Sequence, residues 1–189
     1  EFKKVGGKGI AAPSANRFGH VSPTTAQAVA TELSEYLAPE DLILDGGPCL
    51  VGVESTIIDC TTENPKVLRP GAITDEMIEI GTGLTLSNNS SDIRVSGSLE
   101  NHYSPSAKVL LDIAPVPGDG LIATSDFATP YGVIRLASPR NNEEFARILY
   151  SALRSADTQG ISRVVVHQPL GDDISTAIRD RLQRASNGR

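Results

Sequence analysis

The side chains best suited to chemistry lie in short turns and at the predicted starts of helices. The segment Ala12–Asn16 (APSAN) has small residues, which let a ligand approach the backbone, and offers the hydroxyl of Ser14 and the amide of Asn16. Ser22-Pro23 predicts a helix start with Ser as the N-cap, where free N–H groups suit phosphate. Taken alone, the first pattern is more typical of a polar turn and the second of a plain helix cap than of a ligand site.

Three later groups add candidates of the same kind. Glu54-Ser55-Thr56 places polar side chains within a predicted strand, where they either face solvent or contact a ligand. Arg69, at a strand end before Pro-Gly, suits a carboxylate or phosphate, although a lone arginine more often makes a surface ion pair. His102-Tyr103 lies in a polar stretch, as a ligand contact or a packing anchor. The sequence contains no metal-ligand cluster, nucleophile elbow or phosphate-binding glycine loop.

The elements expected to position the first groups are short. Apolar residues at helical spacing predict a helix that opens at Ser22-Pro23, with its end marked by Pro39. The predicted strands are Gly9–Ala12, a buried strand at Leu42–Asp45, Val53–Asp59 and Val67–Arg69. A short helix capped by Thr74 is expected after them.

The second half of the chain shows a different pattern. Residues 81–106 are turn-rich and aperiodic, which predicts a linker or functional loop. Beyond them, strands at 109–111, 121–123, 133–134 and 164–166 are expected to alternate with two amphipathic helices. Alternation of this kind predicts a small α/β domain with a mostly parallel sheet.

Composition is that of a globular protein, with 39% hydrophobic and 21% charged residues among 189. The net charge of −6 gives little support to broad binding of nucleic acid. Residues 1–106 carry a net charge of −7 and residues 107–189 a net charge of +1, which suggests two units.

No apolar run approaches the roughly 18 residues of a membrane span. Cys49 and Cys60 are expected to be buried thiols in a reducing cytoplasm.

Taken in order, these motifs resemble the threonylcarbamoyl-AMP synthase family. APSAN, SPTT at 22–25, GVESTI at 52–57 and LRPG at 68–71 are similar to the second-half motifs of its YrdC-type catalytic domain. The stretch 96–105, ending in HYSP, resembles the interdomain linker of its two-domain members. The resemblance covers almost the whole chain.

The resemblance implies an α/β fold with three parts. Residues 1–80 would be the C-terminal half of a YrdC-type mixed α/β twisted sheet, with its N-terminal half missing. Residues 81–106 would be a linker, and residues 107–189 a small Rossmann-like α/β domain.

The activity implied is that of an L-threonylcarbamoyladenylate synthase. Such enzymes condense L-threonine, bicarbonate or CO2, and ATP with Mg2+, releasing pyrophosphate. Downstream transferase proteins pass the threonylcarbamoyl group to a tRNA adenosine in the cytoplasm. A positional and electrostatic mechanism without a covalent intermediate is expected.

The resemblance also implies roles for individual residues. Ser14, Ser22, Arg69 and the neighbouring Asn16 would contact ATP. Ser55, and the backbone near Ala12, would contact threonine. His102 and Tyr103 would fold the linker over the nucleotide and exclude water.

The sequence departs from the family pattern in two places. Phe18 stands where the family has a small residue, and His20 replaces a commoner basic or polar residue. The lysine-and-arginine motif of the family's first half has no match. We therefore expect either a fragment, inactive alone, or a degenerate member.

Two other functions remain open from the sequence. One is a non-catalytic module that binds double-stranded RNA or the ribosome, because YrdC-type domains present a concave surface to RNA. The other is a related carbamoyl-adenylate enzyme that uses carbamoyl phosphate. The linker and the small C-terminal domain match the threonine enzyme better.

Overall fold

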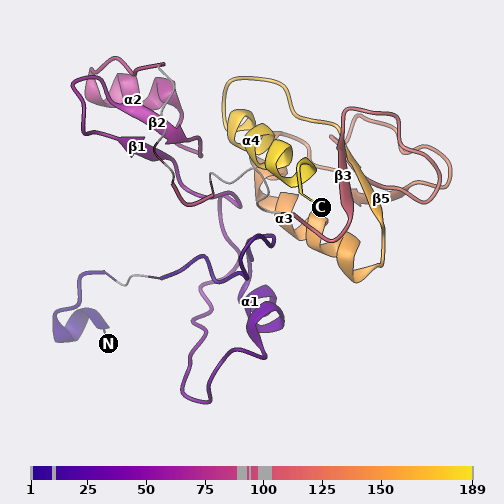
Figure 1. The fold of residues 1–189 in the computed structure, drawn as a ribbon, viewed down its shortest axis with the longest axis horizontal. Coiled ribbons are helices and arrows are strands. Elements are labelled where there is room, and N and C mark those ends of the chain that lie inside the picture. Colours follow the sequence, from indigo (N-terminus) through magenta and orange to yellow (C-terminus); the bar gives the residue numbers. More distant parts are fainter. Residues whose placement is uncertain (1, 10–11, 89–92, 94, 98–103, 189) are drawn as a thin grey trace.

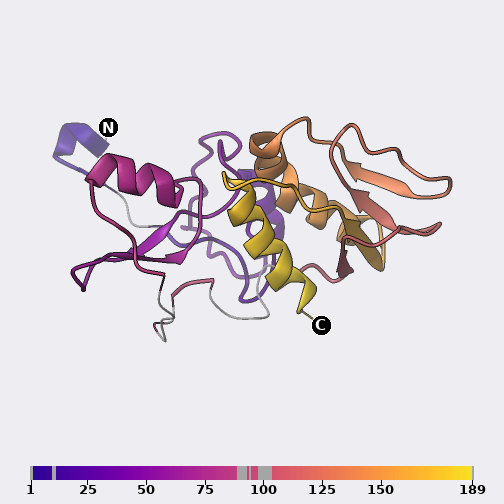
Figure 2. The same ribbon diagram turned by 90° about the horizontal axis from the view of Figure 1, so that it is seen from above.

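The chain forms two regions that differ in secondary structure. The computed structural model describes residues 2–9, 12–88, 93, 95–97 and 104–188. In Figure 1 the C-terminal α/β domain lies at one end and a hairpin with its helix at the other. Figure 2 shows the same separation from above. Among the described residues, no helix has the length and apolar character needed to cross a membrane.

A four-stranded parallel sheet is the centre of the C-terminal domain. Its strands are β3 (Lys108–Leu111), β4 (Gly120–Ile122), β5 (Ile134–Ala137) and β6 (Arg163–Val166). They are arranged in the order β3-β6-β4-β5, and each neighbouring pair is parallel. The expected α/β class and parallel sheet are therefore confirmed.

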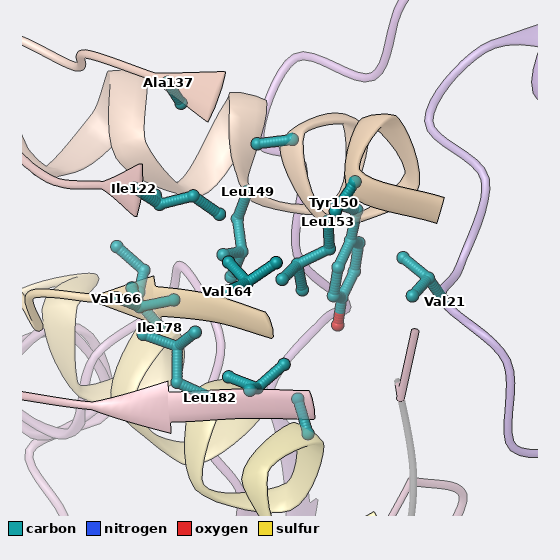
Figure 3. Packing of buried hydrophobic residues seen from close by; sticks show 14 of the residues in the cluster. Val21, Ile122, Ala137, Leu149, Tyr150, Leu153, Val164, Val166, Ile178 and Leu182 are labelled. Atoms are coloured by element: carbon teal, nitrogen blue, oxygen red, sulfur yellow. The ribbon is translucent and has the colours of Figure 1, made fainter. Parts of the chain in front are cut away.

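Two helices cover one face of this sheet. Helix α3 (Asn142–Thr158) is capped by the side chain of Asn141, and α4 (Ser175–Ser186) follows β6. Both contribute to the core cluster that contains Val109, Ile122 and Val164, and Figure 3 shows this packing. A smaller cluster without helical residues covers the other face. Doubly wound Rossmann folds have helices on both faces, so the Rossmann-like detail is not confirmed.

The first region has shorter elements: a 3-10 helix (Phe2–Val5), α1 (Ala26–Leu33), β1 (Ile57–Asp59), β2 (Lys66–Arg69) and α2 (Asp75–Thr82). Strands β1 and β2 pair antiparallel, with Ile58 opposite Val67. The helix α2 lies beside this hairpin in both ribbon views. Its Thr74 cap is confirmed, since the Thr74 hydroxyl accepts a hydrogen bond from Met77 N.

The predicted start of the first helix was wrong. Ser22 does not cap α1; the N-cap is Thr25, whose hydroxyl accepts from Ala28 N. Both residues can cap a helix, but the Ser22 hydroxyl is engaged elsewhere, with Glu54. The helix also ends at Leu33, well before Pro39.

Two expectations about burial were also wrong. The segment Leu42–Asp45 forms no strand, and its leucines are 84% and 77% exposed. An apolar run becomes a buried strand only when a neighbour pairs with it, and no described strand does so. Cys49 and Cys60 are both free and exposed. The linker boundaries 81 and 106 stay a prediction, because much of that stretch lies outside the described residues.

Candidate functional site

A candidate site is a cavity of about 600 Å³ between the first region and α3. Both parts of the chain contribute to it, since Tyr150 lies on α3 and the other lining residues precede Ser55. The lining residues are Pro13, Ser14, Ala15, Ser22, Pro23, Thr24, Val29, Cys49, Leu50, Val51, Gly52, Val53, Glu54 and Tyr150. A volume of this size is typical of small-molecule sites.

Close backbone packing fixes one side of the cavity against α3. Gly52 has φ +87°, a conformation that favours glycine, and it is buried. A Cβ at Gly52 would overlap the α3 backbone at Ala146 and Arg147. This position therefore requires glycine for two independent reasons.

Glu54 is the centre of a buried polar network at the cavity. Its Oε1 accepts a 2.7 Å hydrogen bond from the Ser22 hydroxyl. Its Oε2 accepts from the Tyr150 hydroxyl at 2.8 Å and from Arg181 Nε at 2.9 Å. In Figure 3, Tyr150 lies at the end of the core nearest Val21. One carboxylate thus joins the first region to both α3 and α4.

The opposite charges of Glu54 and Arg181 offset the unfavourable burial of each side chain. Burial by itself would raise the pKa of Glu54, but hydrogen bonds from Ser22 and Arg181, and the Arg181 charge, hold that pKa below its usual value. The Arg181 side chain is fully buried and also donates to Asp180 at 2.7 Å. Glu54 is therefore ionised at neutral pH.

A second ion pair joins the same regions beside the cavity. Arg154 on α3 donates to Glu32 on α1 at 2.9 Å and to the carbonyl of Val21. Glu32 also accepts from Arg17 Nε at 3.1 Å. Val21 itself is part of the C-terminal domain's core cluster. The segment that carries Ser22 is thus fixed to α3 on both sides.

Two of the predicted ATP contacts come together in the cavity. Ser14 and Ser22 both line it. Asn16 lines neither this cavity nor the next, and its amide donates to the carbonyls of Arg17 and His20, at 3.1 and 3.0 Å. Asn16 therefore shapes the turn after Ser14. Ala12 is exposed and is absent from the described lining of the cavity.

Ser55, the predicted threonine contact, lies in an adjoining cavity of about 400 Å³. The two cavities share Val51, Val53 and Glu54 as lining residues. Ser22 and Ser55 thus line two neighbouring cavities that have part of their walls in common.

Arg69 supports the Ser55 segment. It is only 6% exposed, and its Nε and Nη2 donate to the Ser55 carbonyl at 3.0 and 2.9 Å. Its Nη1 donates to the Ser96 carbonyl at 2.8 Å. The guanidinium therefore ties the hairpin to the segment around Ser96, and its contact with ATP stays a prediction. His102 and Tyr103 lie outside the described residues.

Sequence reasoning did not single out Tyr150 or Arg181. Arg181 has a recognisable signal, because it follows Ile178 by three residues and Ala177 by four, on the apolar face of α4. An arginine at such a position requires a buried acidic partner. The sequence could not show that this partner is Glu54, 127 residues away.

Comparison with known proteins identifies the family. The family model "Threonylcarbamoyl-AMP synthase, C-terminal domain" matches residues 73–187, and a model described as "Telomere recombination" matches residues 2–71. The chain belongs to the threonylcarbamoyl-AMP synthase family. This confirms the resemblance inferred from the ordered motifs.

Members of the family align with nearly the whole chain. The threonylcarbamoyl-AMP synthase of Bacillus subtilis is 33% identical, with 95% of this chain and 58% of the relative covered. The threonylcarbamoyl-AMP synthase of Schizosaccharomyces pombe is 31% identical, and the alignment covers 94% of this chain and 52% of that relative. The crystal structure of Pyrococcus abyssi Sua5 complexed with L-threonine matches with a TM-score of 0.76 and 32% identity, covering 93% of this chain and 57% of that one. The chain spans about half the length of these relatives.

Proposed function

We propose that this chain is part of an L-threonylcarbamoyladenylate synthase and that its two neighbouring cavities hold ATP and L-threonine. The observation that carries the proposal is that Ser14 and Ser22 line one cavity and Ser55 lines the cavity beside it. The similarity in fold to a Pyrococcus abyssi protein crystallised with L-threonine supports it.

The cavities suit the chemistry that this function requires. Bicarbonate takes up a proton and loses water to give CO2, and the neutral threonine amine adds to this CO2 and releases a proton to form a carbamate. A carbamate oxygen then attacks the α-phosphorus of ATP, and pyrophosphate leaves. Two compartments that share Val51, Val53 and Glu54 would hold the reactants side by side.

Magnesium would enter as part of the nucleotide substrate. The described residues contain no group of three or more His, Cys, Asp or Glu side chains that could hold a metal ion. Glu54, the one carboxylate among the described lining residues, is already engaged by Arg181. Mg2+ is commonly held by substrate phosphates and water with few protein ligands, so MgATP fits without a dedicated protein site.

The partners follow from this function. Bicarbonate would be the third substrate, and tRNA-modifying transferases would receive the product in the cytoplasm. The alternative, a module that binds double-stranded RNA, is less well supported because the net charge is −6.

Calorimetric titration tests the proposal most simply. We expect the chain to bind MgATP, and to bind it more tightly when threonine is present. Ser14→Ala and Ser22→Ala should each weaken ATP binding by about tenfold, the loss of roughly one hydrogen bond.

Ser186→Ala, near the end of α4, is the matched control and should leave ATP affinity unchanged. Binding of neither ligand by the wild-type chain would contradict the proposal. Equal affinities in Ser22→Ala and the control would exclude Ser22 from the site.

A further inference from the structure

The buried Arg69 clamps the backbone of Ser55, which is itself exposed. Its Nε and Nη2 both donate to the Ser55 carbonyl, and Nη2 also lies 3.4 Å from the Ser55 hydroxyl oxygen. Its Nη1 donates to the Ser96 carbonyl at 2.8 Å. The planar guanidinium makes all these bonds at once, which the single ammonium group of a lysine cannot reproduce. The position of Ser55 therefore depends on Arg69.

Two further contacts fix the segment Ser55-Thr56. Gly71, two residues after Arg69, is buried, and a Cβ at this position would overlap Thr56 N and the Ser55 carbonyl carbon. The Thr56 hydroxyl donates to the Ile73 carbonyl at 2.7 Å. The turn that follows β2 thus packs directly against the backbone that carries the Ser55 side chain.

The Ser55 hydroxyl is available to a ligand as a donor. Ser55 is exposed and lines the smaller cavity. A serine hydroxyl has one proton to donate and two lone pairs, and the Arg69 contact uses only a lone pair. Within the described part of the chain, no group accepts the Ser55 proton. The hydroxyl can therefore donate to an oxygen atom of a ligand.

The charge behind Ser55 favours an anionic ligand group. Arg69 is only 6% exposed, and buried charged side chains usually have a partner of opposite charge. Among the residues that the structure describes, Arg69 forms no ion pair, because its bonds go to neutral carbonyls and a hydroxyl. Glu54, which also lines the smaller cavity, is paired with Arg181. A positive charge thus remains uncompensated behind the Ser55 side of the cavity.

We propose that Arg69 is a positioning residue: it holds Ser55 so that the Ser55 hydroxyl donates to the carboxylate of an amino acid in the smaller cavity. Arg69 acts through Ser55, since it is not among the described residues that line this cavity. That the amino acid is L-threonine rests on the proposed function. The clamp of Arg69 on Ser55 does not depend on it.

A double-mutant cycle on L-threonine binding tests this role, by calorimetry of the 189-residue chain. Arg69→Lys keeps the charge but loses the clamp, and Ser55→Ala removes the hydroxyl. We expect each variant to bind L-threonine about tenfold more weakly, the loss of roughly one hydrogen bond. The double variant should bind no more weakly than either single one, because Arg69 acts through Ser55. Losses that multiply to about a hundredfold would overturn the proposal.

MgATP titrations distinguish the carboxylate from a phosphate as the anionic group. Arg69→Lys should weaken L-threonine binding more than MgATP binding. The reverse order would assign Arg69 to the nucleotide and overturn the proposal. Arg140→Lys is the matched control, because Arg140 makes an exposed pair with Glu144, and it should change neither affinity.

Amide hydrogen exchange tests the clamp without any ligand. Arg69→Lys should speed exchange in residues 53–58 relative to β6, and Arg140→Lys should not. Unchanged exchange in residues 53–58 would overturn the proposal. If the wild-type chain binds neither ligand, the proposed function fails, while the exchange result still decides whether Arg69 holds Ser55.

Gly71→Ala is a second variant, for use if Arg69→Lys does not fold. Its methyl group would displace the Ser55-Thr56 backbone while Arg69 stays in place. We expect it too to speed exchange in residues 53–58 and to weaken L-threonine binding more than MgATP binding. L-threonine affinity equal to that of wild type would overturn the dependence of the site on the position of Ser55.

Discussion

The two regions of this chain are ordered in different ways. The C-terminal domain has a core of its own: apart from Val21, every buried residue of the main cluster lies at position 107 or beyond. The first region instead leaves many large apolar side chains exposed, including Phe18, Leu42 and Leu44. Its cavity-lining segment is held by contacts with α3 and α4, chiefly the pairs Glu32–Arg154 and Glu54–Arg181.

This difference shows what the C-terminal domain contributes to the site. The domain supplies a stable surface, and the segment around Ser22 and Gly52 is shaped against it. Glu54, which accepts from the Ser22 hydroxyl at the cavity, is itself held by the buried Arg181, so this segment is sensitive to changes at Arg181. Variants at the junction should therefore have larger effects than variants within the first region.

Removal of Arg181 is the strongest test of that difference. Arg181→Ala should destabilise the chain by about 3–5 kcal/mol, because it leaves the Glu54 carboxylate buried without its cation. Urea unfolding followed by circular dichroism measures this. Arg140→Ala, which breaks an exposed ion pair with Glu144 on α3, is the control and should cost at most about 1 kcal/mol.

Truncation of matched leucines compares the regions directly. Leu149→Ala in α3, where the side chain is fully buried, should cost about 2–5 kcal/mol through lost burial and a cavity. Leu44→Ala, 77% exposed, should change stability by less than about 0.5 kcal/mol. Similar losses for the two variants, again by urea unfolding, would show that the first region has a core of its own.

A methyl group at Gly52 tests the contact between the regions. Gly52→Ala should cost about 1–3 kcal/mol, because the residue has a positive φ and its Cβ would overlap the backbone of Arg147. Amide hydrogen exchange should then increase near Ser22 more than in β6. A uniform increase across both regions would argue against a local junction.

Acid should weaken the junction through Glu54. Because the folded-state pKa of Glu54 is lowered, its contribution to stability is present above the unfolded pKa of about 4.3 and is lost as pH falls through the folded pKa. Glu54→Gln should therefore reduce the pH dependence of the melting temperature below that value. An unchanged acid profile in this variant would assign the dependence to other carboxylates, such as Glu32, whose pKa is also lowered.

The sequence predicted the C-terminal domain better than the first region for a physical reason. The apolar face of α3, from Phe145 to Ala156, is buried by its own neighbours, so its periodicity and its structure agree. The run Leu42–Asp45 has the composition of a buried strand but lacks a pairing partner among the described residues. Local pattern predicts an element only where tertiary partners are present.

The candidate site was predictable in part. Ordered motifs located Ser14, Ser22 and Ser55, which the structure places at two neighbouring cavities. The roles of Tyr150 and Arg181 depend on contacts across 96 and 127 residues, and no local pattern encodes such contacts. The family motifs therefore identified one side of the cavity, and only the fold identified the other.

The most direct test of the central claim uses the two cysteines as reporters. Cys49 lines the cavity and Cys60 follows β1 outside its described lining, and both are free and exposed. We would measure the alkylation rate of each by mass spectrometry, with and without MgATP and threonine. The account predicts that the ligands slow alkylation of Cys49 severalfold and leave Cys60 unchanged. Equal rates at Cys49 with and without ligands would contradict the assignment of this cavity as the substrate site.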